Sequence, residues 1–392
     1  MVTIHDYELY MPARVMFGVG ISAKAGEVLK DLGATKVLVV TDQGVVGANL
    51  LDNILPSLEK AGLSYNVFDK ALPDAPLSKI QAGLKIQKKE GSDYLLGVGG
   101  GSSIDTAKGI GCLATNPGPL PNYEGPEKYK NPPLPSVAVP TTAGTGSETS
   151  FGAVAFDEER QYKFSFRSAM QIPKVALLDP LLLKSTPPRL AAASGLDALS
   201  HCIEAYTSDW STLITDAYCK QNFYLIGQYL RRFVADASDL EAAAAMLQSS
   251  TMGSLAFNTA RLGLDHAMGH PLGTHFHLPH GIACGILLPP VMRYNLMSCP
   301  ERYIDIAVGL QGMVQGDLKM EKAYCAVEAV ECLIQDCGVE VDFSSYDITE
   351  ELLSTMADET LQSGFQLSNP RKASKEDVIN IFRDLFKGNQ TN

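Results

Sequence analysis

In the first half of the chain, short apolar runs rich in β-branched residues alternate with amphipathic segments. We predict buried strands at 36–41, 64–68, 94–98 and 136–139. Predicted helices lie between them, among them 20–32 and 77–90. The stretch 116–135 is rich in proline, glycine and asparagine and is predicted to be loop. Strand, helix and strand in repeated order imply a parallel sheet with helices on both faces.

Beyond Asp179 the strand patterns become scarce and long helical patterns replace them. Examples are 212–234, 240–258 and 320–336. The run Ser185-Thr186-Pro187-Pro188 would end one element and begin the next. We therefore expect an α/β domain over residues 1–185 and an all-helical domain over residues 186–392.

Composition agrees with two folded domains. The chain has 392 residues, of which 45% are hydrophobic and 19% are charged, so it can bury a large core. Acidic residues outnumber basic ones by 44 to 32, which gives a net charge of −12 at pH 7. This charge is unfavourable for binding nucleic acid or an anionic membrane, and neither is expected as a partner.

The eight cysteines include no CxxC pair, and most lie in apolar surroundings. We expect buried, reduced thiols, as in a cytoplasmic protein, rather than disulfides. The first residues, MVTIHDYELYMPARVMF, are mixed and acidic, so they do not have the pattern of a signal peptide. Apolar runs all fall short of the roughly 18 residues that span a membrane, and no span is expected.

A glycine-rich run, Gly97 to Ser103, follows the predicted strand 94–98 and precedes a helix expected from about Ile104. Exposed backbone amides and the positive end of a helix dipole would stabilise a pyrophosphate there. A tight turn without a ligand is the alternative. The Rossmann pattern GxGxxG is not met because position 102 is serine, and the Walker pattern is absent.

A second polar loop, Pro140 to Glu148, follows the fourth predicted strand, and Asp42 follows the first. The carboxyl ends of parallel strands share one edge, so these loops would face one crevice. Asp42 could accept hydrogen bonds from a ribose 2′-hydroxyl and would repel a 2′-phosphate. Its alternative role is that of a turn residue beside Gly44.

Histidines gather in the second half of the chain. Asp197 and His201 are four residues apart, which places them on one face of a helix, and His266 and His270 repeat that spacing. His280 is expected on the next loop. One carboxylate and several imidazoles suit iron(II) or zinc(II). The zincin pattern HExxH is absent, which disfavours a metalloprotease.

Several of these residues have a second plausible role. Asp197 could be a first-turn carboxylate favoured by a helix dipole. Glu204 is either a further ligand or a solvated charge. Asp265 points about 100° away from its neighbour around a helix, so it is left out of the ligand set. His275 and His277, in the expected loop before His280, could be structural.

The motifs resemble those of the iron-containing (group III) alcohol dehydrogenase family. The matching stretches are GGGSSIDTAK at 99–108, PTTAGTGSE at 140–148, GLDALSHCIEAY at 195–206 and HAMGHPLGTHFHLPHG at 266–281. The resemblance extends over nearly the whole chain. It implies an α/β dinucleotide-binding domain and an all-α domain, the fold shared with dehydroquinate synthase, with the active site in the cleft between them.

The resemblance also assigns residues. The metal ligands implied are Asp197, His201, His266 and His280. His270 matches a histidine beside the nicotinamide and substrate, and is the expected catalytic residue. Asp42 matches the position that favours NAD. Cofactor-binding positions implied in the two loops are Gly99, Gly100, Ser102, Asp105, Thr141, Thr142 and Ser147.

The resemblance predicts an NAD(H)-dependent enzyme, with Fe²⁺ or possibly Zn²⁺, that interconverts a small primary alcohol and its aldehyde. Arg261, Lys163 or His275 would suit an anionic aldehyde such as sulfoacetaldehyde or succinic semialdehyde. Asp265 and the His275–His277 triplet depart from the usual family pattern. A metal-dependent lyase of the dehydroquinate synthase type would be an enzyme of a different class, and a binding protein without activity is a third possibility. The edge strand expected at 14–17 could pair in a homodimer or a larger homo-oligomer.

Overall fold

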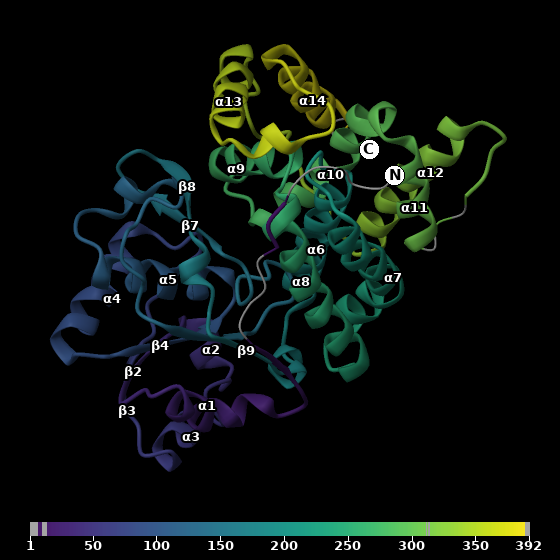
Figure 1. Ribbon diagram of the computed structural model, residues 1–392. Helices are drawn as coiled ribbons and strands as arrows, with labels where there is room; N and C mark the ends of the chain where they lie inside the picture. Colours follow the sequence, from purple (N-terminus) through teal and green to yellow (C-terminus); the bar gives the residue numbers. More distant parts are fainter. Residues whose placement is uncertain (1–6, 10–13, 311, 313, 389–392) are drawn as a thin grey trace. The chain divides into compact units, whose positions relative to one another are not determined.

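The computed structural model describes residues 7–9, 14–310, 312 and 314–388 (Figure 1). These residues form two compact units, one within Tyr10–Thr186 and the other within Pro187–Asn392 together with residues 7–9. The sequence predicts that residues 1–185 form the first domain, whereas residues 7–9 belong to the second unit. The hydroxyl of Thr259 donates a hydrogen bond of 3.2 Å to the Glu8 carbonyl, which links residues 7–9 to the second unit.

The first unit is built on a six-stranded sheet in the order β1-β9-β6-β4-β2-β3, in which every pairing is parallel. Its strands are β1 (Val15–Phe17), β2 (Lys36–Val40), β3 (Ser64–Phe68), β4 (Tyr94–Gly99), β6 (Ser136–Pro140) and β9 (Val175–Leu178). The four predicted strands are confirmed. The continuous apolar runs of β2, β4 and β6 fit central strands of a sheet that is covered on both faces, whereas the more polar β3 lies at one edge.

Helices cover the two faces of this sheet. They are α1 (Ala25–Asp31), α2 (Gln43–Gly47), α3 (Leu55–Lys60), α4 (Leu77–Glu90) and α5 (Gly101–Thr115). In Figure 1, α1 and α3 lie on one side of the sheet and α4 and α5 on the other. The helix predicted at 20–32 begins as a short 3-10 turn, Ile21–Lys24, before α1. Helix α5 begins three residues earlier than predicted, so the last of the loop glycines is already its first residue.

The first unit also has a small second sheet, β5-β8-β7, which the sequence did not predict. Strands β7 (Gly152–Asp157) and β8 (Tyr162–Arg167) form an antiparallel hairpin. Strand β5 (Gly125–Pro126) pairs in parallel with β8. The hairpin contacts α5. The stretch 116–135, predicted as loop, also holds a 3-10 turn at Leu120–Tyr123.

The second unit is helical, and its described residues include no strand. Its helices are α6 (Pro188–Thr207), α7 (Leu213–Ala235), α8 (Leu240–Ala260), α9 (Leu264–Phe276), α10 (His280–Asn295), α11 (Pro300–Gly309), α12 (Lys319–Asp336), α13 (Glu350–Gln362) and α14 (Lys375–Gly388). The helices predicted at 212–234, 240–258 and 320–336 are confirmed by α7, α8 and α12. The described helices are all too short or too polar to cross a bilayer.

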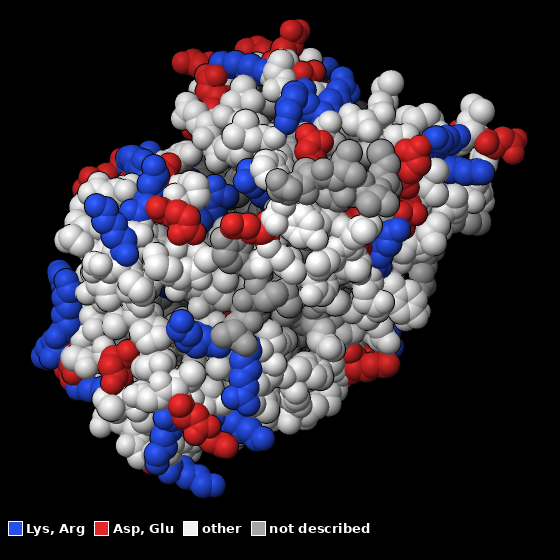
Figure 2. Space-filling model, in the orientation of Figure 1, with Lys and Arg blue, Asp and Glu red and all other residues white. Residues whose placement is uncertain are grey.

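Charges on the face shown in Figure 2 are mixed. Blue and red side chains alternate over most of that face, and much of the area between them is uncharged. On this face, therefore, neither positive nor negative charge is concentrated in one large patch.

Candidate metal centre

Helix α6 brings Asp197 and His201 to one buried face. They lie one turn apart in the interior of this 20-residue helix, and their exposed fractions are 3% and 5%. The interpretation of Asp197 as a first-turn carboxylate is therefore wrong, because α6 begins nine residues earlier, at Pro188. A carboxylate placed here is removed from water and needs a partner of opposite charge.

Helix α10 packs directly on α6 because its first turns carry glycine. A Cβ atom at Gly281 would lie 2.0 Å from the Ala193 carbonyl oxygen and 3.1 Å from the Asp197 Cβ. One turn later, a Cβ at Gly285 would lie 2.8 Å from the Leu196 side chain. Any larger residue at either position would push the helices apart. This close approach carries the neighbouring His280 to the Asp197 carboxylate.

The structure corrects the sequence prediction for the histidine-rich segment. His280 is the first residue of α10, rather than a loop residue, because the extended Pro279 before it starts the helix. His275 lies in the last turn of α9, and His277 ends that helix with φ 52°. The loop between the two helices is therefore only three residues long, and His266 and His280 lie on two rigid helices.

Three imidazoles converge on one carboxylate oxygen. Oδ1 of Asp197 lies 3.9 Å from Nε2 of His201, 3.8 Å from Nε2 of His266 and 3.7 Å from Nε2 of His280. These distances are too long for hydrogen bonds. Ligand atoms around a tetrahedral zinc or iron ion are roughly 3.4 Å apart, given metal–ligand bonds of about 2.1 Å. Small inward movements of the side chains would therefore complete a site.

Two of these atoms indicate that the cluster binds a cation. Oδ1 of Asp197 and Nε2 of His266 are buried and have no hydrogen-bond partner among the described residues. Buried polar atoms are rarely left in this state, because each costs about 1–3 kcal/mol. A bound divalent cation would satisfy both atoms at once. A nitrogen-rich donor set with one carboxylate suits iron(II) or zinc(II).

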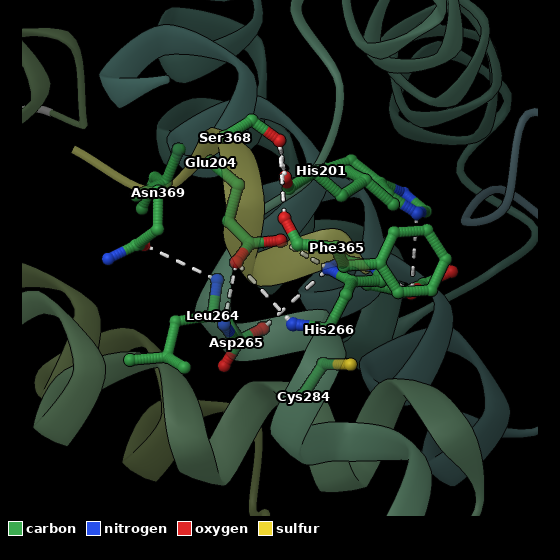
Figure 3. A network of polar contacts seen from close by, with 12 residues as sticks. His201, Glu204, Leu264, Asp265, His266, Cys284, Phe365, Ser368 and Asn369 are labelled. Atoms are coloured by element: carbon green, nitrogen blue, oxygen red, sulfur yellow. Dashed lines mark hydrogen bonds and ion pairs between the residues drawn. The ribbon is translucent and has the colours of Figure 1, made fainter. Parts of the chain in front are cut away.

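Glu204 holds the imidazole of His266 from the other side. Its Oε2 lies 2.6 Å from Nδ1 of His266, and its Oε1 accepts a hydrogen bond of 2.6 Å from the Asp265 amide (Figure 3). With the proton on Nδ1, Nε2 is left with a lone pair that faces Asp197. Glu204 is buried, so its interpretation as a solvated charge is wrong.

Asp265 lies on the Nδ1 side of His266. Its Oδ2 is 3.9 Å from Nδ1, and the side chain is completely buried beside Glu204. Burial and the charge of Glu204 raise the pKa of Asp265 well above its usual value. This environment favours a neutral Asp265 carboxyl.

The charges around the site shift the pKa values of two proposed ligands. Burial lowers the pKa of His266, but Glu204 and Asp197 raise it more strongly, to about 10. Burial raises the pKa of Asp197, but the positive charge of the facing histidines, His201 first, lowers it well below the usual range. In the metal-free protein the site is thus a proton-holding cluster of one carboxylate and several imidazoles.

Metal binding is expected to strengthen as the pH rises. A cation can bind Nε2 of His266 only after the proton leaves, and that proton is held up to a pKa of about 10. Each displaced proton raises the apparent affinity about tenfold per pH unit. By the same linkage, protonation of His266 stabilises the metal-free protein. This contribution to the free energy of unfolding is fully present below about pH 6.5 and is lost as the pH rises through about 10. Zinc titrations against a chelator from about pH 6 to about pH 8 measure the slope, and a flat line would contradict it.

His270 lies at the border of this cluster. Its ring centroid is 5.5 Å from that of His280 and 5.4 Å from that of Phe365, in the 3-10 turn Phe365–Ser368. It is half-buried, one turn after His266 on α9. The structure therefore places His270 beside His280, one of the predicted ligands.

In the α/β unit, the loops predicted to bind a cofactor meet at the carboxyl ends of β2, β4 and β6. From β2 the chain continues to β3 on one side, and from β4 it continues to β6 on the other side, so the carboxyl ends of the neighbouring strands β2 and β4 form a topological switch point. Asp42 spans it, since Oδ1 accepts a hydrogen bond from the Val45 amide and Oδ2 accepts one of 2.8 Å from the Ser103 hydroxyl. Sequence reasoning did not identify Ser103.

Several of the other predicted cofactor-binding residues form hydrogen bonds or packing contacts within the α/β unit. The Ser102 hydroxyl accepts a hydrogen bond from the Asp74 amide, and Gly100 packs against the side chain of Thr142. Thr141, at the end of β6, is buried. Asp105 accepts hydrogen bonds from the Ser147 hydroxyl and from the Val154 amide. Asp105 and Ser147 therefore hold the second loop against α5.

Lys108, which sequence reasoning also missed, reinforces this connection. Its ammonium donates to the Ser147 hydroxyl, to both oxygens of Ser150 and to the Gly152 carbonyl, at 2.8–3.2 Å. Burial lowers its pKa to about 8, although Asp105 and Glu148 oppose that shift. A buried ammonium with four acceptors fixes the second loop in one conformation.

Alanine at Gly99 is expected to destabilise the α/β unit. Gly99 has φ 149°, and a Cβ there would lie 2.7 Å from the Ser103 side chain and 3.0 Å from Oδ2 of Asp42. We expect a loss of about 1–3 kcal/mol in the free energy of unfolding, together with weaker dinucleotide binding. Chemical denaturation measures the first effect and fluorescence titration the second. The control is Gly47→Ala, in α2, where a Cβ meets nothing within 4 Å; equal stability of the two variants would contradict the prediction.

The residues considered for an anionic substrate have other partners. Arg261 is exposed, and its guanidinium lies 4.0 Å from the centroid of the Trp210 ring. Lys163 is buried in an ion pair of 2.8 Å with Asp74, and His275 pairs with Glu359 at 3.1 Å. Each of the three side chains therefore has a partner within the protein.

Comparison with known proteins identifies the family. Residues 12–180 match the iron-containing alcohol dehydrogenase family, and residues 191–386 match its C-terminal domain. The chain is 38% identical to 1,3-propanediol dehydrogenase of Citrobacter freundii over 97% of this chain and 99% of that protein. It is 36% identical to NAD-dependent methanol dehydrogenase of Bacillus methanolicus, over 96% and 99%.

A solved structure agrees with the helical and α/β architecture described above. The crystal structure of a 1,3-propanediol oxidoreductase superposes with a TM-score of 0.94 at 38% identity, over 97% of this chain and all of that one. The expected fold class, an α/β unit followed by an all-helical unit, is confirmed. The chain belongs to the iron-containing alcohol dehydrogenase family and is an alcohol dehydrogenase or aldehyde reductase.

Proposed function

We propose that this enzyme is NAD(H)-dependent and metal-dependent, and that it interconverts a small primary alcohol and its aldehyde, with aldehyde reduction as the main direction. The single observation that carries the metal part is the convergence of three Nε2 atoms on the buried Oδ1 of Asp197. The name of the methanol dehydrogenase relative supports NAD as the dinucleotide.

The proposed ligands are Asp197, His201, His266 and His280, and the proposed ion is Fe²⁺, with Zn²⁺ as the alternative. A divalent ion supplies Lewis acidity, which stabilises negative charge on the substrate oxygen and lowers the pKa of an alcohol. Glu204 keeps His266 in the tautomer that can bind, so the donor atoms are oriented before the ion arrives.

Other residues of the chain would bind and orient the reactants. The amides of Gly99 and Gly100, at the positive end of α5, would bind the pyrophosphate, and Ser102, Thr141 and Thr142 would line the same crevice. Asp42 would accept hydrogen bonds from the adenosine ribose, which favours NAD over NADP. Asp105 and Ser147 would contribute indirectly, by holding the loop Pro140–Glu148 in position. His270 would orient the substrate or pass a proton to its oxygen.

We also propose a cytoplasmic homodimer or larger homo-oligomer. All eight cysteines, each among the described residues, are thiols, as is usual in a reducing compartment. Strand β1 lies at the edge of the main sheet, and Val15 and Phe17 are exposed there at 40% and 44%. An apolar edge strand is a surface that a second subunit can cover.

The test is a substrate screen that follows NADH absorbance. The enzyme is loaded with iron or zinc and supplied with neutral and anionic aldehydes of equal length, with NADPH in place of NADH as a second series. We expect metal-dependent oxidation of NADH with neutral aldehydes, and a higher kcat/KM with NADH than with NADPH. A screen in which loaded enzyme oxidises neither dinucleotide would overturn the proposal and favour a lyase or a non-catalytic binding protein.

A further inference from the structure

An aspartate that the proposed function does not use lies beside the glycine loop of the α/β unit. Asp74 is in the segment that connects β3 to α4, at the carboxyl end of the edge strand β3. Its backbone amide donates a hydrogen bond of 3.1 Å to the hydroxyl of Ser102, in the first turn of α5. Gly99 and Gly100, whose amides we propose bind the pyrophosphate, immediately precede this turn. An acidic residue therefore lies next to a site proposed for an anion.

The backbone of this segment has an unfavourable conformation. Asp74 has φ 63° and Ala75 has φ 46°, in the left-handed region that residues other than glycine adopt infrequently. Contacts with β7 maintain it, because the Phe156 amide donates a hydrogen bond of 3.4 Å to the Ala75 carbonyl and Pro76 forms a bridge with Phe156. Such residues persist where the surrounding structure fixes them, and they are concentrated at functional sites. The fold thus holds Asp74 in place beside the glycine loop.

Lys163, on β8, pairs with the Asp74 carboxylate. Its Nζ lies 2.8 Å from Oδ1 of Asp74. The two ends of this ion pair differ in exposure, since the Lys163 side chain is 6% exposed and the Asp74 side chain is 40% exposed. The accessible charge of the pair is therefore the negative one.

A carboxylate and a pyrophosphate compete at a helix N-terminus, because the positive end of the helix dipole attracts both. We propose that the Asp74 carboxylate weakens binding of the dinucleotide at the glycine loop and thereby speeds its release. Product release limits turnover in many enzymes, so a weaker hold on the dinucleotide favours a higher kcat. This inference rests on the proposed function, since it assumes that NAD(H) binds at the glycine loop.

The test compares the affinity of the full-length enzyme for NADH in variants of the ion pair. Asp74→Asn removes the negative charge, and asparagine tolerates positive φ and can still accept a hydrogen bond from Lys163. We expect the Kd for NADH, measured by fluorescence titration, to fall at least about fivefold. The NADH dissociation rate, measured by stopped flow, should fall with it. Lys163→Gln leaves the carboxylate without its counter-charge and should raise the Kd.

Two controls show whether the effect is local and electrostatic. Glu90→Gln removes the same charge from an ion pair of 3.0 Å with Lys36, which is at the amino end of β2 and thus at the opposite end of the strands from the glycine loop. We expect its Kd for NADH to be unchanged. In about 1 M salt the changes in Asp74→Asn and Lys163→Gln should shrink, because the Debye length is then only about 3 Å.

A purely structural ion pair predicts a different pattern. If the pair only held the segment in place, Asp74→Asn and Lys163→Gln would both raise the Kd for NADH. That result, or an unchanged Kd in Asp74→Asn, would refute the inference and leave the proposed function standing. Wild-type enzyme that binds neither NADH nor NADPH would refute the proposed use of NAD(H) as well. Asp74→Ser removes the charge with a different side chain and should also lower the Kd, so the test does not depend on the folding of one variant.

Discussion

Replacing His266 with alanine is expected to abolish stoichiometric metal binding and to lower kcat/KM by more than about 100-fold. His266 is 2% exposed, and its Nε2 is a buried atom without a hydrogen-bond partner among the described residues. The substitution removes a donor and also removes the imidazole that contacts Oε2 of the buried Glu204. Metal content after dialysis and NADH oxidation with a neutral aldehyde measure the two effects.

The matched control for this variant is His275→Ala. His275 lies on the same helix, α9, but is paired with Glu359 and is only partly buried. We expect it to keep one metal ion per chain and nearly full activity. Should His266→Ala retain bound metal and turnover at the level of His275→Ala, His266 could not be a ligand.

Replacing Glu204 with glutamine is expected to lower metal affinity by about 10–100-fold, even though Glu204 is not a proposed ligand. The side chain keeps its size, so the fold should be preserved. It loses the charge that orients the Nδ1 proton of His266 and raises the pKa of that ring. A glutamine can also present its NH₂ group to Nδ1, which would move the ring proton to Nε2 and block the donor.

The readout for Glu204→Gln should separate positioning from a general loss of structure. We expect weaker zinc binding in a chelator competition, together with a shallower dependence of affinity on pH, because His266 holds its proton less tightly. Glu241→Gln, in which an exposed carboxylate on α8 loses its pairing with Arg232, serves as the control. An unchanged zinc affinity in Glu204→Gln would exclude the positioning role.

The sheet could be predicted because its central strands are buried on both faces. Such strands read as continuous apolar runs, and the runs at β2, β4 and β6 are unambiguous. The hairpin of β7 and β8 could not be found in this way. In β8, Tyr162, Phe164 and Phe166 alternate with polar residues, which is the pattern of a half-buried strand rather than of a continuous apolar run. The antiparallel pairing of β8 with β7, and the contact of β7 with α5, are tertiary features.

The histidine cluster was predicted from spacing, but spacing did not assign every role. The i, i+4 pair on α6 needs only helical geometry. The assignment of Glu204 needed its position relative to His266, which is 62 residues away in the chain.

The sequence by itself determined the family, the order of an α/β unit and a helical unit, and the residues that could ligate a cation. These properties are carried by local patterns and by long motifs, which are readable along the chain. The tertiary structure decided which donor atoms meet and which side chains support them. Helix contacts such as that of Gly281 with Ala193 bring distant residues within a few ångströms, and only this packing distinguishes a ligand from a buried neighbour.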